Sequence, residues 1–229
     1  RQSYLTQNKG DFPTQTDFFG VQYVKVDDLR YGTNPHQPAA YYKPVRAAAS
    51  VIGDMQVIKN GKNGLSQTNL EDISYSLNIV KYFSEPACAC MKHVNPCGAA
   101  YAAPGEPLKA VYIKARECDP HAHFGSVIAF NVRVDKDTAE EIMSTFVECV
   151  VAPDYDNDAV AVFCNPEAKL NRHVRILKCG DLSLLPKFTG DDVSSCHTFK
   201  TLADGTVVVS EPLLTNLRSV ADLKHQMDS

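Results

Sequence analysis

The sequence has no long apolar segment and no marked excess of charge of one sign. No run approaches the ~20 apolar residues that a membrane-spanning helix requires. The first ten residues are polar and lack the apolar core of a signal peptide. The 23 basic and 27 acidic side chains are interspersed and give a formal net charge of −4. We therefore expect neither a membrane nor nucleic acid as a partner, and we predict a cytoplasmic location.

The eight cysteines lack the spacing of a metal site or a disulfide framework. No C-x-x-C pair occurs, and several cysteines lie inside apolar runs such as residues 148–151. We expect Cys88 and Cys90 to lie on opposite faces of a strand. The pattern predicts free thiols that pack as small hydrophobic side chains in a reducing compartment.

Short apolar segments alternate with amphipathic ones through most of the chain. Helical spacing of apolar residues predicts helices over 69–83, 107–117 and about 157–163, with a further helix carrying Ile142 and Met143. This alternation is typical of the α/β class, with a mainly parallel or mixed sheet and helices on both faces. The predicted strands are 21–26, 39–42, 55–59, 87–93, 125–130, 150–153 and 174–177.

Two helices carry recognisable start signals. Thr68 and Glu71 form the pattern of a capping box at the start of the helix over 69–83. Asp137, with Glu140 three residues later, is predicted to cap the helix that carries Ile142.

The composition changes after about residue 185. Strand-like segments at 198–202 and 206–209 flank Asp204-Gly205, which predicts a C-terminal β-hairpin. A closing helix is expected over 217–227. We therefore predict a lead-in segment over 1–20, an α/β domain over 21–185, and a hairpin with a helix over 186–229.

The segment from Lys92 to Gly98 has the strongest chemical signal. A buried strand leads to adjacent cationic and imidazole side chains, and Asn95-Pro96-Cys97-Gly98 then predicts a tight turn. Side chains at strand ends of open α/β sheets commonly line the ligand crevice. The Lys92 ammonium disfavours a charged His93 imidazole, so His93 suits a general base and Lys92 an oxyanion stabiliser. The alternative is a strand end with a solvated lysine and a hydrogen-bonded histidine.

The loop from Arg30 to Gln37 is a second candidate. It places a guanidinium, a phenol, an amide and an imidazole within eight residues. Arg30 suits a phosphate or a carboxylate. A polar surface loop would have the same composition.

Two other catalytic possibilities are weaker. Cys97 could be a nucleophile with His93 as its base, which would make the protein a hydrolase, although a small residue after Pro96 also fits a tight turn. His121 and His123 supply two possible metal ligands, but no third ligand lies at a suitable spacing. We expect no metal.

Three segments in register resemble one family. Arg30-Tyr31-Gly32-x-Asn34-Pro35-His36-Gln37 comes first, Lys92-His93-x-Asn95-Pro96-Cys97-Gly98 second, and Phe124-Gly125 with Val150 to Tyr155 third. Together they resemble the AICAR transformylase domain of the bifunctional purine-biosynthesis protein that also carries IMP cyclohydrolase. The resemblance covers about residues 21–209.

The resemblance implies a fold, a reaction and a set of residues. The fold would be a three-layer, cytidine-deaminase-like α/β fold without its metal. The reaction would transfer the formyl group of 10-formyltetrahydrofolate, a cosubstrate, to the 5-amino group of AICAR (5-aminoimidazole-4-carboxamide ribonucleotide). His93 would accept the proton of the amine, and Lys92 would stabilise the oxyanion or assist the proton transfer. Nucleotide-binding residues would be Arg30, Tyr31 and His36, with Asn69, Gly125 and Glu148 lining the same pocket.

The chain also departs from the family pattern. The cyclohydrolase domain, which normally precedes the transformylase domain, is not in this sequence, and the family's transformylase region is longer. His121-Ala122-His123 replaces residues that are usually Ser- or Val-rich. We therefore keep two hypotheses: a formyltransferase acting as a homodimer with sites across the subunit interface, and a nucleotide-binding fragment without catalysis.

Overall fold

The computed structural model of the chain describes residues 12–46, 49–61, 63–193 and 196–227. Its contacts divide the chain into two compact units, Arg1–Leu182 and Ser183–Ser229. The domain boundaries predicted near residues 20 and 185 stay a prediction. Among the described residues, no helix combines the length and the apolar composition needed to cross a membrane.

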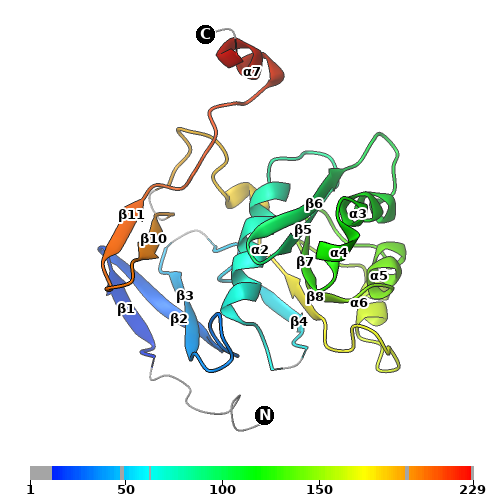
Figure 1. The fold of residues 1–229 in the computed structure, drawn as a ribbon, viewed down its shortest axis with the longest axis horizontal. Coiled ribbons are helices and arrows are strands. Elements are labelled where there is room, and N and C mark those ends of the chain that lie inside the picture. Colours follow the sequence, from blue (N-terminus) through cyan, green and yellow to red (C-terminus); the bar gives the residue numbers. More distant parts are fainter. Residues whose placement is uncertain (1–11, 47–48, 62, 194–195, 228–229) are drawn as a thin grey trace. The chain divides into compact units, whose positions relative to one another are not determined.

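A six-stranded mixed sheet forms the centre of the first unit (Figure 1). Its strand order is β4-β9-β8-β7-β5-β6. The strands β7, β8 and β9 run parallel, whereas β5 is antiparallel to both of its neighbours and β4 is antiparallel to β9. The predicted α/β class is therefore confirmed. The strands are β4 (Gln56–Lys59), β5 (Ala87–Lys92), β6 (Asn95–Tyr101), β7 (Ser126–Phe130), β8 (Val147–Ala152) and β9 (Arg175–Lys178).

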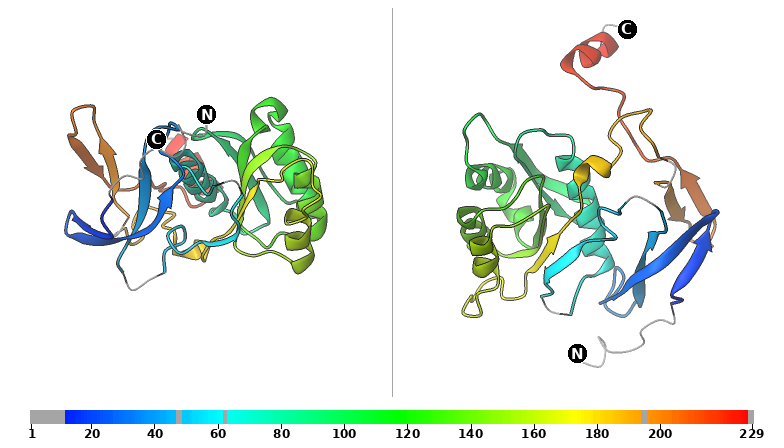
Figure 2. Two further views of the ribbon diagram at one scale, coloured as in Figure 1. Left: turned by 90° about the horizontal axis from the view of Figure 1, so that it is seen from below. Right: turned by 180° about the vertical axis from the view of Figure 1, so that it is seen from behind.

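Helices cover both faces of this sheet, as the two views in Figure 2 also show. On one face, α2 (Gln67–Val80) packs against β5 and β7. The other face carries four helices: α3 (Leu108–Glu117), α4 (Pro120–His123), α5 (Lys136–Met143) and α6 (Asn157–Phe163).

The alternation of side chains along β5 separates the two buried layers. Cys88 and Cys90 both belong to the hydrophobic cluster that also contains residues of α3, α5 and α6. The expectation that these two cysteines lie on opposite faces is wrong, because residues two apart on a strand share a face. Ala89 and Met91 are equally buried, and alternation along the strand places them on the other face, which α2 covers.

β5 and β6 form a hairpin whose turn consists of His93 and Val94 alone. The register pairs Lys92 with Asn95. The turn predicted at Asn95–Gly98 is therefore wrong, since these residues begin strand β6. Pro96 is tolerated there because β6 is an edge strand, where a missing N–H costs no ladder hydrogen bond on the open side.

Gly98 allows α3 to lie directly on β6. A Cβ atom at this position would lie 1.9 Å from the carbonyl oxygen of Ala115, a backbone atom of α3. The glycine is therefore needed for a close approach of two elements rather than for a turn.

Two helices begin at residues other than those predicted. Ser66, not Thr68, caps α2: its hydroxyl accepts from the Asn69 amide, and the Asn69 side chain accepts from the Ser66 amide. Asp135, not Asp137, caps α5, with its carboxylate accepting from the Thr138 amide at 2.8 Å. Both segments contain two residues able to cap, and the apolar periodicity does not distinguish between starts two residues apart.

A three-stranded antiparallel sheet precedes the larger one. It contains β1 (Gln15–Phe18), β2 (Val21–Leu29) and β3 (Ala39–Pro44). β1 lies within the predicted lead-in segment 1–20, of which residues 1–11 fall outside the described part. β2 extends three residues beyond the strand predicted at 21–26, which brings the following loop to the start of α2.

The second unit contains the predicted hairpin. β10 (Thr198–Thr201) and β11 (Val207–Ser210) pair antiparallel, with positive φ at Gly205 in the connection. α7 (Val220–Met227) begins three residues later than the predicted helix over 217–227. A 3-10 turn, Leu182–Leu184, spans the boundary between the units.

The contact at Gly98 gives a direct test of the fold. Gly98→Ala should lower the free energy of unfolding by about 1–3 kcal/mol, because α3 must move away from β6 to admit the methyl group. Urea denaturation measures the change. Ala99→Ser, at an exposed position of the same strand, is the control and should change stability by less than about 0.5 kcal/mol. Equal stability of both variants would contradict the close approach.

Candidate active site

The candidate residues lie at one end of the strands of the six-stranded sheet, where the parallel strands β7, β8 and β9 begin. Because β5 is antiparallel to β7, its C-terminal residue Lys92 lies beside the N-terminal end of β7, where Ser126 begins the strand. In a parallel sheet the ligand crevice usually lies at the opposite end, outside the carboxyl ends of the strands. The α2 helix precedes β5 in the chain and packs on it, so its N-terminal half comes to the same edge as the hairpin turn.

The turn at His93 and Val94 has an uncommon backbone. Both residues have positive φ, 53° and 65°, as in a type I′ turn. Such turns favour Asn and Gly, and a β-branched residue in the left-handed region is disfavoured. A strained residue of this kind costs on the order of 1–3 kcal/mol, so the surrounding structure must hold it. The His93 side chain is exposed at the tip.

Asp72 of α2 holds this turn. One carboxylate oxygen accepts from the Val94 amide at 2.6 Å and the other from the His93 amide at 3.2 Å. Asp72 is only 6% exposed. Burial raises the pKa of its carboxyl above the ordinary value, and the two amide hydrogen bonds oppose that rise.

Lys92 is held from the opposite side of the sheet. Its ammonium Nζ donates to the carbonyl oxygen of Phe124 at 2.6 Å. Phe124 follows α4 directly, and the next residue, Gly125, has φ 77° and donates its amide to Phe146 at 2.9 Å. The second and third segments of the resemblance described above are therefore in contact here, because the Phe124 carbonyl accepts a hydrogen bond from the Lys92 side chain.

The loop with Arg30 and Tyr31 joins the N-terminus of α2 through the backbone. The Arg30 amide donates to the Leu65 carbonyl at 2.8 Å, and the Gln67 amide donates to the Tyr31 carbonyl at 3.1 Å. The Arg30 guanidinium lies 5.0 Å from the centre of the Tyr31 ring. Its Nε is buried and has no hydrogen-bond partner within the described part of the chain. A buried guanidinium nitrogen without a partner favours a ligand at this position.

Asn69 and His36 have different surroundings. Asn69 is 8% exposed and its side-chain oxygen closes the capping box of α2, so this oxygen is already used. His36 lies in the exposed turn of residues 32–37, which the Gly32 amide closes by donating to the Gln37 carbonyl at 2.7 Å.

Glu148 forms an ion pair at this edge of the sheet. Arg175, at the start of β9, donates through Nη1 to the Glu148 carboxylate at 2.8 Å and through Nε to the Gly64 carbonyl at 2.5 Å. The Arg175 side chain is 5% exposed and that of Glu148 is 38% exposed. Arg175 therefore connects Glu148, near the start of β8, to the loop before α2.

Sequence reasoning missed Asp72 and Arg175. Both carried a usable signal. Asp72 lies three residues after Asn69 and four before Ser76, both buried, and a carboxylate on the buried face of a helix requires partners. Arg175 lies within a short buried strand, where an unpaired guanidinium would be costly.

The weaker catalytic candidates have ordinary structural surroundings. The Cys97 thiol donates to the Cys90 carbonyl at 3.3 Å, and burial raises its pKa to about 11. His123 is buried with Nε2 3.1 Å from the Tyr112 hydroxyl, whereas His121 is exposed. Within the described residues, no group of three or more His, Cys, Asp or Glu side chains has the arrangement of a metal site.

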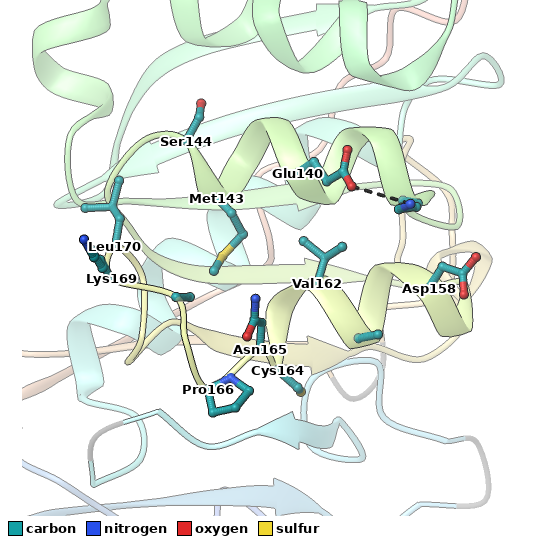
Figure 3. Close-up of a pocket in the computed structure, with 13 residues that line it drawn as sticks. Glu140, Met143, Ser144, Asp158, Val162, Cys164, Asn165, Pro166, Lys169 and Leu170 are labelled. Carbon is teal, nitrogen blue, oxygen red and sulfur yellow. Dashed lines mark ion pairs between the residues drawn. The ribbon is translucent and has the colours of Figure 1, made fainter.

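A cavity of about 970 Å³ lies away from these residues, between α5, α6 and the loop that follows α6 (Figure 3). Its lining contains two basic and two acidic side chains, Lys136, Lys169, Glu140 and Asp158. Lys136 and Glu140 pair with each other at 3.7 Å. The cavity therefore offers no excess of charge for an anionic ligand.

Comparison with known proteins places these residues in a family. The family model described as AICARFT/IMPCHase bienzyme matches residues 2–215, which is most of the chain. The chain belongs to this family. Its three recognised segments all lie inside the matched range.

Several curated relatives are called bifunctional purine biosynthesis protein PurH. The protein of Clostridium kluyveri (strain ATCC 8527) is 41% identical over 217 residues, 93% of this chain and 38% of that protein. The protein of Clostridium perfringens (strain SM101) is 38% identical over 177 residues, 77% of this chain and 32% of that protein. The chain thus spans about a third of the length of the curated relatives it matches.

A solved structure, Acinetobacter baumannii RibD in form 2, is similar at a TM-score of 0.36 and 17% identity. The similarity covers 49% of this chain and 35% of RibD. A score of this size carries no inference about the fold or the reaction.

The surroundings of Cys97 predict low thiol reactivity. With a pKa of about 11, on the order of one Cys97 thiol in a few thousand is ionised at pH 7.5. Iodoacetamide at pH 7.5 should therefore alkylate the exposed Cys118 and Cys164 well before Cys97, as peptide mass spectrometry can measure. Preferential alkylation of Cys97 would instead support the hydrolase alternative.

Proposed function

We propose that this chain supplies the formyl-transfer residues of the AICARFT/IMPCHase family rather than the cyclohydrolase ones. The transferred group would come from 10-formyltetrahydrofolate and the acceptor would be the 5-amino group of AICAR. The observation that carries the proposal is the Lys92-His93 hairpin, held at a sheet edge by contacts from α2 on one side and Phe124 on the other. Membership of the family supports the same reaction.

The reaction needs a base and a cation at one carbon atom. The amine nitrogen attacks the formyl carbon, and the C–N bond forms while His93 takes the proton of the amine. The Lys92 ammonium stabilises the resulting oxyanion: it has three donors, of which one already binds Phe124. The tetrahedral intermediate then breaks its bond to N10 of the folate, which takes the proton that His93 accepted from the amine. The exposed position of His93 suits contact with both substrates.

Arg30, Tyr31 and His36 would hold the nucleotide. The buried Nε of Arg30, which has no partner among the residues that the structure describes, favours an anionic group of the ligand near this side chain. Asn69, Gly125 and Glu148 would line the same pocket. Glu148 would do so through its exposed portion, because Arg175 binds one of its oxygens.

The proposal includes a fold assignment and an assembly. A mixed sheet between α2 and the layer of α3, α5 and α6 is compatible with a cytidine-deaminase-like, three-layer fold. A homodimer with sites built across the interface would supply contacts additional to those of this chain.

A second candidate is a nucleotide-binding chain without catalysis. The buried Arg30 Nε, which has no hydrogen-bond partner within the described residues, favours a bound anion and says nothing of turnover. An assay of the 229-residue chain with both substrates separates the two. Formyl transfer supports the first candidate, and AICAR binding without turnover supports the second.

The role of His93 can be tested with a substitution that preserves the turn. His93→Asn should lower kcat for formyl transfer by about 100-fold or more in the complete enzyme, because the base is lost. Asn is used rather than Ala since it tolerates the left-handed backbone. His121→Asn, at an exposed histidine of α4, is the control and should keep kcat within about twofold. Near-normal turnover by His93→Asn would exclude His93 as the base.

A further inference from the structure

The carboxylate of Asp72 has an unusual set of partners. Within the described residues, no Lys or Arg forms an ion pair with it. Its hydrogen bonds instead come from the backbone amides of His93 and Val94. A buried carboxylate without a cation depends on such donors, so Asp72 and the turn stabilise each other.

The two amides are both available because of the turn conformation. Left-handed φ at His93 and Val94 points their successive N–H groups toward the α2 side, where one carboxylate oxygen meets each. The Asn95 side chain adds a further bond, donating to the His93 carbonyl at 2.8 Å. The conformation of the turn therefore depends on contacts with side chains rather than on its own two residues.

The residues of the turn would not favour this conformation alone. A type I′ turn forms readily with Asn-Gly, and such a turn needs no neighbouring side chain to hold its conformation. Here the turn is His-Val, and Val94 is β-branched. Val94 is also 38% exposed, so packing of its side chain holds the turn only in part.

Other ionisable groups near Asp72 come from three elements. His93 of the hairpin favours the carboxylate, whereas Glu71 of the same helix disfavours it. Cys149 of β8 also faces it, and burial raises the pKa of that thiol to about 12. At neutral pH the cysteine is therefore uncharged and the turn amides are the main partners of the carboxylate.

We propose that Asp72 is the positioning residue of the site: its carboxylate holds His93 and Val94 in the left-handed turn and thereby fixes where the imidazole stands. This inference rests on the proposed function, because it assigns a purpose to the placement of His93. Within the described residues, the hydrogen bonds of the Asp72 carboxylate come from the two backbone amides of the turn, and the carboxylate takes no part in proton transfer.

The test is a double-mutant cycle in the complete enzyme. Asp72→Asn replaces one acceptor oxygen by an NH₂ group and should lower kcat about 10- to 100-fold, with KM for AICAR changed less than about threefold. Val94→Gly alone should keep kcat within about threefold. The Asp72→Asn/Val94→Gly variant should recover at least about tenfold of the lost kcat, because glycine adopts positive φ unaided. Glu71→Gln is the matched control and should keep kcat within about twofold.

A second readout is independent of turnover. Hydrogen exchange of the Val94 amide should be at least about tenfold faster in Asp72→Asn than in the unsubstituted protein or in Glu71→Gln. If Asp72→Asn does not fold, the double variant should fold, since it no longer needs the carboxylate to hold the turn.

Three outcomes would overturn the positioning role. They are unchanged exchange at Val94 in Asp72→Asn, a double variant no more active than Asp72→Asn, and a double variant that also fails to fold. Failure of the proposed function is distinguishable, because it would show as normal turnover in His93→Asn, while the exchange measurement would still report on Asp72.

Discussion

The reversed direction of β5 within the sheet determines where the candidate residues Lys92 and His93 lie. Because β5 runs against β7, its last residue stands beside the N-terminal ends of the parallel strands, and the preceding α2 helix brings its N-terminal half to the same edge. Asp72 reaches the hairpin turn, and Leu65 and Gln67 bind the backbone of the Arg30 loop. With β5 parallel to β7, Lys92 would lie at the opposite end of the sheet from Phe124, whose carbonyl it binds, and from Glu148.

The helix α2 was predictable because burial on one face imposes a helical spacing. The strands β5, β7 and β9 were predictable because strands buried on both faces are continuous apolar runs. The C-terminal hairpin follows from the Asp-Gly pair between two strand-like segments. The position of the β5–β6 turn was not predictable, since Asn-Pro-Cys-Gly resembles a turn more than His-Val does. The contact of Asp72 with the His-Val turn, which comes from another element, stabilises the turn that forms. The observed helix caps lie two residues before the predicted ones at α2 and α5, where two nearby side chains are both able to cap.

The candidate site was predictable in residue type but not in arrangement. The sequence singles out Lys92, His93 and the Arg30 loop from their chemistry, and the structure connects them through α2 and Phe124. The edge of the sheet at which they lie depends on strand direction, which composition does not reveal. The partners Asp72 and Arg175 were missed because buried charges are identified by what surrounds them, and their neighbours come from distant parts of the chain.

The bond from Arg175 to Gly64 has a consequence for how the chain folds. It joins residues 111 positions apart, and β4 and β9 pair across a similar separation. Contacts between such distant residues must overcome the entropy of closing a long loop, so they form late. On a ribosome, the edge that carries His93 would therefore be completed only after β9 has emerged. The β5–β6 hairpin joins residues that are close in sequence, so it can form before the residues that surround it are in place.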